Sequence, residues 1–157
     1  MAPLLTDACT PEAAAAIASG RRGLVWLTQP VPALTDARPF WREAMHVVDH
    51  NRFGLPSHDH ADLTAHGIAS GLCLMADSDA WVRAFAHPGL TIASRPWRSF
   101  DARRFDWRDH WLDLNIGSGH CALTTLRLAG GEGEQPAQLM SNPLGVWLLA
   151  RGLTLAS

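Results

Sequence analysis

The sequence has no lysine and no tyrosine, so its 13 lysine-or-arginine positions are all arginine. The absence of tyrosine excludes a common proton donor from any mechanism. The formal net charge is only −2 and the pI is near 6.4, which argues against a strongly basic surface, so we expect no nucleic-acid or membrane partner. No apolar run approaches the roughly 20 residues of a membrane span, and residues 1–16 lack the basic start of a secretory signal.

Cysteine is also scarce. The three cysteines, Cys9, Cys73 and Cys121, are odd in number and form no CxxC pair, which indicates reduced thiols and a cytoplasmic protein. The chain has 157 residues, of which 47% are hydrophobic and 18% charged. We therefore expect one globular domain over residues 1–157, long enough to need no disulfide or metal for stability.

Capping residues and apolar spacing predict helices in three places. Thr10 and Pro11 begin an alanine-rich helix that runs to Ser19. A second helix is expected from residue 36 or 38 to His50, followed by a polar loop over 51–62, and another helix covers 144–150.

Short apolar or alternating runs predict strands over 23–27, 68–75, 81–85, 90–93, 110–116 and 137–140. The strands 68–75 and 81–85 are expected to form a hairpin. Residues 97–108 are charged and aromatic, which predicts a loop or a short helix whose arginines pair internally with aspartates. The order of elements indicates a mixed α+β fold.

The triplet Gly117-Ser118-Gly119 follows the strand 110–116, and we expect it to open a helix containing Leu123 and Leu126. A strand that runs into such a turn presents free backbone N–H groups to an anion, and the helix dipole favours negative charge there. The alternative, a plain turn, stays open.

The order of elements over about residues 68–155 resembles the C-terminal half of the GNAT superfamily of acyl-CoA-dependent N-acyltransferases. The resemblance implies a central, mostly antiparallel sheet flanked by helices. It also implies transfer from acetyl-CoA or another acyl-CoA to a small-molecule or peptide amine. The positions that it assigns to the coenzyme are Gly117, Ser118, Gly119, His120 and Asn142.

Two residues of the family's sequence pattern are absent from this chain. The pattern places Gln or Arg three residues before Gly117 and a general-acid tyrosine on the last helix, where this chain has Leu114 and Leu148. A non-catalytic ligand-binding or interaction protein on the same fold is therefore an alternative function.

Acyl transfer needs a base that deprotonates the amine, and the central strand offers two candidates. Asp113 is the first choice, and His110 lies beside it on the same strand. The alternative is that Asp113 only caps a neighbour or pairs with a nearby arginine.

Histidines suggest a further function. His46 and His50 are spaced i,i+4 on the expected second helix, and His58 and His60 form an HxH pair. Neutral imidazoles at these spacings suit a divalent metal, as in a metal-dependent oxygenase. The alternative is a polar helix end and loop without metal.

Overall fold

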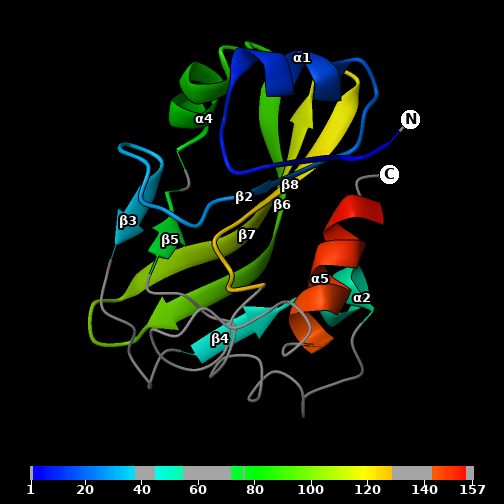
Figure 1. Cartoon of the computed structure of the whole chain (residues 1–157). Coiled ribbons are helices and arrows are strands. Elements are labelled where there is room, and N and C mark those ends of the chain that lie inside the picture. The colour runs from blue at the N-terminus through cyan, green and yellow to red at the C-terminus, as the bar shows by residue number, and fades with distance from the viewer. Residues whose placement is uncertain (1, 38–44, 55–71, 76, 129–142, 155–157) are drawn as a thin grey trace.

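The computed structural model describes residues 2–37, 45–54, 72–75, 77–128 and 143–154. They form a mixed α+β fold with one mostly antiparallel sheet, which confirms the expected fold class (Figure 1). The helices are α1 (Pro11–Ala18), α2 (His50–Phe53), α4 (Ser78–Phe85) and α5 (Pro143–Thr154). The strands are β1 (Leu4–Thr6), β2 (Gly23–Trp26), β3 (Thr35–Ala37), β4 (Met45–Val48), β5 (Leu72–Leu74), β6 (Leu90–Asp101), β7 (Asp106–Ile116) and β8 (Gly119–Thr124).

Strand β7 is the centre of the sheet. It pairs antiparallel with β6 on one side, and on the other with β8 and, at Asp109, with β5. Beyond β8 the sheet continues through β2 to β1, both parallel, while β3 extends β5 and β4 extends β6. The meander β6–β7–β8 therefore holds the N-terminal and middle segments of the chain together.

The β6–β7 pairing is interrupted by β-bulges. Ile92 pairs with Leu114 but Ser94 pairs with Asp113, so β6 carries one extra residue between them. Farther along, Trp97 pairs with Trp111 and Arg98 with Asp109, so that His110 is the extra residue of β7. Each bulge bends the ladder and changes the direction of nearby side chains.

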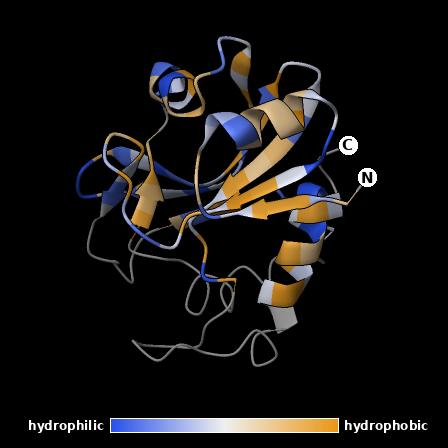
Figure 2. Cartoon of the chain, turned by 45° about the horizontal axis from the view of Figure 1, so that its top comes forward, coloured by the Kyte–Doolittle hydropathy of each residue, from blue (hydrophilic) through white to orange (hydrophobic). Residues whose placement is uncertain are grey.

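Helices cover both faces of the sheet. On one face, α1 and α4 pack Ile17, Trp81 and Phe85 against β7. On the other, α2 and α5 bring Phe53 and Leu148 to Trp97, Trp111 and Leu24. The strands beneath the helices are mostly hydrophobic in Figure 2, as such a three-layer arrangement requires.

Three expected elements are confirmed with small shifts at their ends. In α1, Thr10 Oγ1 accepts the backbone N–H of Ala13 at 3.2 Å and proline occupies the first turn. Strand β2 and helix α5 also lie where the apolar runs predict them. The expected strand over 137–140 lies outside the described residues.

The expected strand over 81–85 is wrong, because these residues belong to helix α4. Asp77 caps this helix by accepting the N–H of Asp79 at 2.9 Å. Trp81 and Phe85, four residues apart, are both fully buried on its inner side. The short apolar run is compatible with the period of a strand and with that of a helix, and the cap at Asp77 favours the helix.

Two further expectations are wrong. The helix expected up to His50 is replaced by β3 and β4, because β4 pairs in register with β6 over Met45 to Val48; residues 38–44 lie outside the described part. The expected loop over 97–108 is instead the end of β6 and the start of β7, with a turn only between Asp101 and Asp106. In the first place the pairing with a distant strand overrides the local pattern, and in the second the two neighbouring strands pair as a hairpin.

In the part of the chain that the structure describes, no helix is both long enough and apolar enough to cross a lipid bilayer.

Candidate functional site

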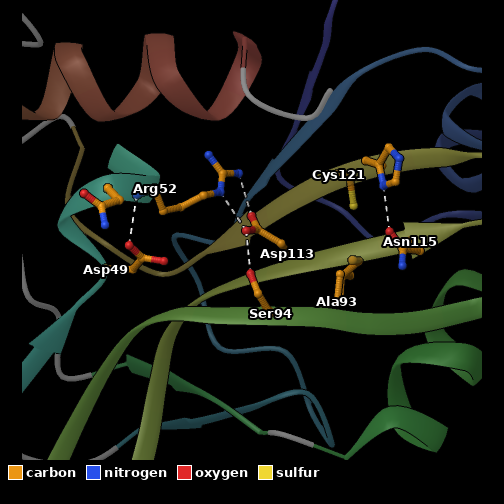
Figure 3. A pocket seen from close by; sticks show the side chains of 10 residues that line it. Asp49, Arg52, Ala93, Ser94, Asp113, Asn115 and Cys121 are labelled. Atoms are coloured by element: carbon orange, nitrogen blue, oxygen red, sulfur yellow. Dashed lines mark hydrogen bonds and ion pairs between the residues drawn. The ribbon is translucent and has the colours of Figure 1, made fainter. Parts of the chain in front are cut away.

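A cleft of about 540 Å³ opens on the face of the sheet next to α2 (Figure 3). Its walls come from α2 and the preceding Asp49, from the β6 bulge, from the end of β7 and from the start of β8. Its lining residues are Asp49, Asn51, Arg52, Ala93, Ser94, Asp113, Leu114, Asn115, His120 and Cys121. Two residues expected from the sequence, Asp113 and His120, thus lie in one cleft.

Asp113 lies in the middle of this cleft and is held by four donors. Arg52 donates from Nε and Nη2, each at 2.8 Å. Ser94 Oγ donates at 2.7 Å and Trp111 Nε1 at 3.1 Å. These bonds fill the acceptor positions of the carboxylate, so the ion pair with an arginine is the arrangement present. A free base is not available at Asp113 in this state.

Arg52 owes its position to the short helix α2. Asp49 Oδ1 caps the helix by accepting the N–H of Arg52 at 3.0 Å. Phe53 anchors the helix to the sheet, and the centre of its ring lies 5.0 Å from the centre of the Trp111 ring. The carbonyl oxygen of Phe53 accepts bonds from Trp147 and Arg151 of α5, so the last helix holds the guanidinium in place indirectly.

His120 and Asn115 form a second polar pair in the cleft. They are opposite each other on β8 and β7, and His120 Nδ1 lies 2.6 Å from Asn115 Oδ1. Because an amide oxygen only accepts, Nδ1 donates and the neutral ring keeps its lone pair on Nε2. An imidazole nitrogen of the exposed His120 ring is therefore available in the cleft that Asp113 also lines.

His110, the other expected base, does not lie in the cleft. The residue is 3% exposed, and its Nε2 lies 2.8 Å from Ser99 Oγ. Burial, together with the nearby side chains of His46 and Arg108, lowers the pKa of His110 to about 3. The bulge that makes His110 an extra residue turns it into this sealed position.

The expected helix after Gly117 is wrong, because Gly119 begins strand β8. Gly117 and Ser118 form a two-residue hairpin turn, with a φ of +59° at Gly117. Ser118 Oγ donates to the carbonyl of Ala18 at 2.9 Å, and a Cβ on Gly119 would overlap the carbonyl oxygen of Ile17. The glycines thus let α1 lie close to the turn, and this turn is not followed by a helix N-terminus that could hold an anion.

The histidines of the metal hypothesis do not share a helix. His46 lies on β4, where its Nδ1 accepts from Trp97 Nε1 at 3.1 Å, and His50 is the first residue of α2. His58, His60 and Asn142 lie outside the described residues. Among the residues that the structure does describe, no group of three or more metal-ligating side chains is present. The divalent metal stays a prediction.

Sequence reasoning missed Arg52, Ser94 and Asn115. Asn115 alternates with Asp113 along β7 and could have been found from the period of two. Arg52 and Ser94 are brought to Asp113 by α2 and by a bulge, for which the sequence has no local signal.

Models of protein families, curated proteins and solved structures were each compared with this chain. None of them matches it.

Proposed function

We propose that this chain binds a small amine in the cleft beside Asp113. The observation that supports the proposal is the charge of the lining. The lining contains two carboxylates, those of Asp49 and Asp113, and one guanidinium, that of Arg52. Because Arg52 neutralises Asp113, the charge of Asp49 remains for a cationic ligand.

Asp49 is the group that would receive the ammonium. Its Oδ1 accepts the N–H of Arg52, whereas Oδ2 has no hydrogen-bond partner among the described residues. Figure 3 shows Asp49 and Ser94 near Asp113, so an amine at Asp49 would have a hydroxyl and an amide, that of Asn115, within the same cleft. A volume of about 540 Å³ is in the range of small-molecule sites.

The decisive experiment measures binding of primary amines and of alcohols of the same shape by calorimetry. Asp49→Asn keeps the helix cap, since asparagine caps as well as aspartate, but removes the charge. Losing a charge-assisted bond should weaken amine binding roughly tenfold or more and leave alcohols unaffected. Asp7→Asn, an exposed aspartate outside this cleft, is the control. Equal affinity of both variants for amines would refute the proposal.

A second candidate function is N-acyl transfer to that amine, and the observation that favours it is His120. Its Nε2 lone pair lies in the same cleft and could take the proton that the amine loses. A bound acyl-coenzyme A would supply the thioester carbonyl that the amine nitrogen attacks, and coenzyme A would leave as the thiol. The coenzyme itself is inferred from the family resemblance alone.

Thermal unfolding with acetyl-CoA tests the second function separately. A ligand at 100 times its dissociation constant adds about 2.7 kcal/mol, which is a shift of several degrees for a chain of this size. Thiol release with an added amine should then fall in His120→Gln but not in His87→Gln, which lies outside the cleft. If the chain binds amines but acetyl-CoA causes no thermal shift, the proposal of amine binding stands and the proposal of acyl transfer is refuted.

A further inference from the structure

The cleft beside Asp113 contains more polar groups than an ammonium alone would engage. Seven of its ten lining residues carry polar or charged side chains. Some of these side chains keep hydrogen-bonding atoms that have no partner within the described part of the chain. A ligand that fills the cleft displaces water from those atoms, and a covered polar group that gains no new hydrogen bond costs free energy. The unpartnered atoms therefore define the chemistry of the ligand.

Asn115 and His120 provide donors and an acceptor close to each other. Oδ1 of Asn115 accepts from Nδ1 of His120, which leaves the amide N–H groups of Asn115 and the Nε2 lone pair of His120 without partners among the described residues. Both side chains are accessible, since Asn115 is half-buried and His120 is exposed. Because a hydroxyl group both donates and accepts, hydroxyls on a ligand satisfy both kinds of atom, whereas an alkyl or aryl group satisfies neither.

These atoms lie at the opposite end of the cleft from the ammonium site. Figure 3 shows Asp49 at one end and Asn115 at the other, with Asp113 and Ser94 between them. Asp113 and Asn115 are two residues apart on β7, and side chains at this spacing lie about 7 Å apart on one face of a strand. A ligand whose ammonium bonds to Asp49 thus reaches Asn115 only with a hydroxyl several bonds away from its amine.

The charge of the cleft disfavours an anionic group on the ligand. Arg52 is the one arginine among the lining residues, and its Nε and Nη2 both donate to Asp113. Its third nitrogen, Nη1, is buried and thus out of a ligand's reach. The charge of Asp49 is not neutralised in this way. A carboxylate or phosphate on the ligand would therefore lose water without gaining a cationic partner.

We infer that the ligand of the cleft is a hydroxylated amine without an anionic group, of the size of an amino sugar; the inference depends on the proposed amine binding and not on acyl transfer. The ammonium bonds to Asp49, and hydroxyls on the far side of the ligand bond to Asn115 and His120. A volume of about 540 Å³ is ample for a six-membered ring with its substituents. In acyl transfer, Nε2 of His120 would take a proton in place of this hydroxyl bond.

Ligands of one ring size test the inference by calorimetry with the full chain, at a pH where the amines are protonated. Glucosamine has the ammonium and the hydroxyls, cyclohexylamine has only the ammonium, and glucose has only the hydroxyls. Glucosamine should bind roughly tenfold or more tightly than cyclohexylamine, which leaves the covered groups of Asn115 and His120 without partners. It should also bind roughly tenfold or more tightly than glucose, which has no charge for Asp49. Glucosamine 6-phosphate should bind more weakly than glucosamine.

Two variants remove the hydroxyl-binding atoms and leave Asp49 in place. Asn115→Leu, which conserves most of the volume, removes the amide, and His120→Leu removes the imidazole. Each should weaken glucosamine binding roughly fivefold and leave cyclohexylamine binding unchanged, and the retained cyclohexylamine binding shows that the cleft is folded. Thr6→Val, at a half-buried position of β1 outside the cleft, is the matched control and should bind both ligands as the parent does.

The outcomes separate this inference from the proposed function. Equal affinity for glucosamine and cyclohexylamine, with both lost in Asp49→Asn, would overturn the inference and leave amine binding in place. So would unchanged glucosamine binding in both leucine variants, or tighter binding of the phosphorylated sugar. Equal affinity for glucose and glucosamine, or binding of none of these compounds, would overturn the proposed amine binding and the inference with it.

Discussion

The two ends of strand β7 finish in turns of opposite character. At one end, Gly117 and Ser118 form a tight turn that lies against the C-terminal end of α1. At the other, the turn between Asp101 and Asp106 contains no glycine and exposes Phe105 almost completely. The sequence draws attention to the first turn, because a glycine pair can cradle a phosphate. In the structure those glycines serve packing, and the second turn carries the side chains that face outward.

A glycine often lies where another group approaches the backbone closely. The difference between the two turns shows that the spacing of glycines in the sequence does not tell which group that is. A ligand phosphate and a helix carbonyl make the same demand on the backbone, namely the absence of a Cβ. At Gly119 the group that approaches is the carbonyl of Ile17. Substitutions in the two turns, and in the strand between them, should therefore change the stability of the chain by different amounts.

The largest effect is expected for Gly119→Val. Its Cβ would overlap the backbone of α1, which has no flexible side chain to move away, so the free energy of unfolding should fall by about 3 kcal/mol or more. Urea unfolding measures this loss. Ser118→Ala, which removes one bond to Ala18, should cost only about 1 kcal/mol. A valine variant of normal stability with weakened coenzyme binding would reverse our interpretation of this turn.

Between the two turns, His110 makes stability depend on pH. Its pKa is near 6.5 when unfolded and about 3 when folded, so below pH 6.5 only the unfolded chain takes up the proton. Stability is therefore full above that pH and falls as the pH drops, by about 2 kcal/mol near pH 5. Unfolding curves at several pH values should show this slope in the parent chain and in His120→Gln. In His110→Gln the slope should be smaller. An unchanged slope in this variant would contradict the attribution of the pH dependence to His110.

Gly117→Ala should have a smaller effect. Its φ of +59° strains any residue with a Cβ, and that Cβ would lie 3.2 Å from the Cβ of Ala18. We expect a loss of about 1 kcal/mol in thermal unfolding. Stability equal to that of the parent would mean that the tight turn tolerates alanine as the wide turn tolerates Phe105.

The smallest effect, of opposite sign, is expected for Phe105→Asn. Phenylalanine adopts a φ of +51° here, which asparagine accepts more readily. Because the ring is 84% exposed, little packing is lost, and stability should rise by about 0.5 kcal/mol in the same measurement. A marked loss of stability would show that the Phe100–Phe105 contact holds the hairpin together.

Local signals account for the part of the fold that could be predicted. The cap at Thr10 with Pro11 and the alternation along residues 110–116 depend only on neighbours in sequence, and both elements are present. Residues 45–48 are a strand because the distant strand β6 pairs with them, which no local pattern encodes. Residues 119–124 follow the two-residue turn Gly117-Ser118, which is a local hairpin signal that the expectation of a helix overlooked. The cap at Asp77 was a local signal for α4 that the apolar run obscured.

The candidate site divides in the same way. Asp113 and His120 were found because polar residues on a central strand and after its turn stand out in sequence. Arg52 is 61 residues from Asp113, and its bond depends on a short helix that α5 holds against the sheet. The partner that decides the chemistry of Asp113 could not be found without the fold.

The place of β2 between β1 and β8 has a consequence for synthesis of the chain. Trp26 Nε1 donates to the carbonyl of Leu126, a bond that joins residues 100 positions apart, and β2 pairs with β8 along its whole length. During translation the β1–α1–β2 unit therefore leaves the ribosome long before the strand that completes it. Until then its apolar strand has an unpaired edge, which is the condition in which nascent chains aggregate or recruit chaperones.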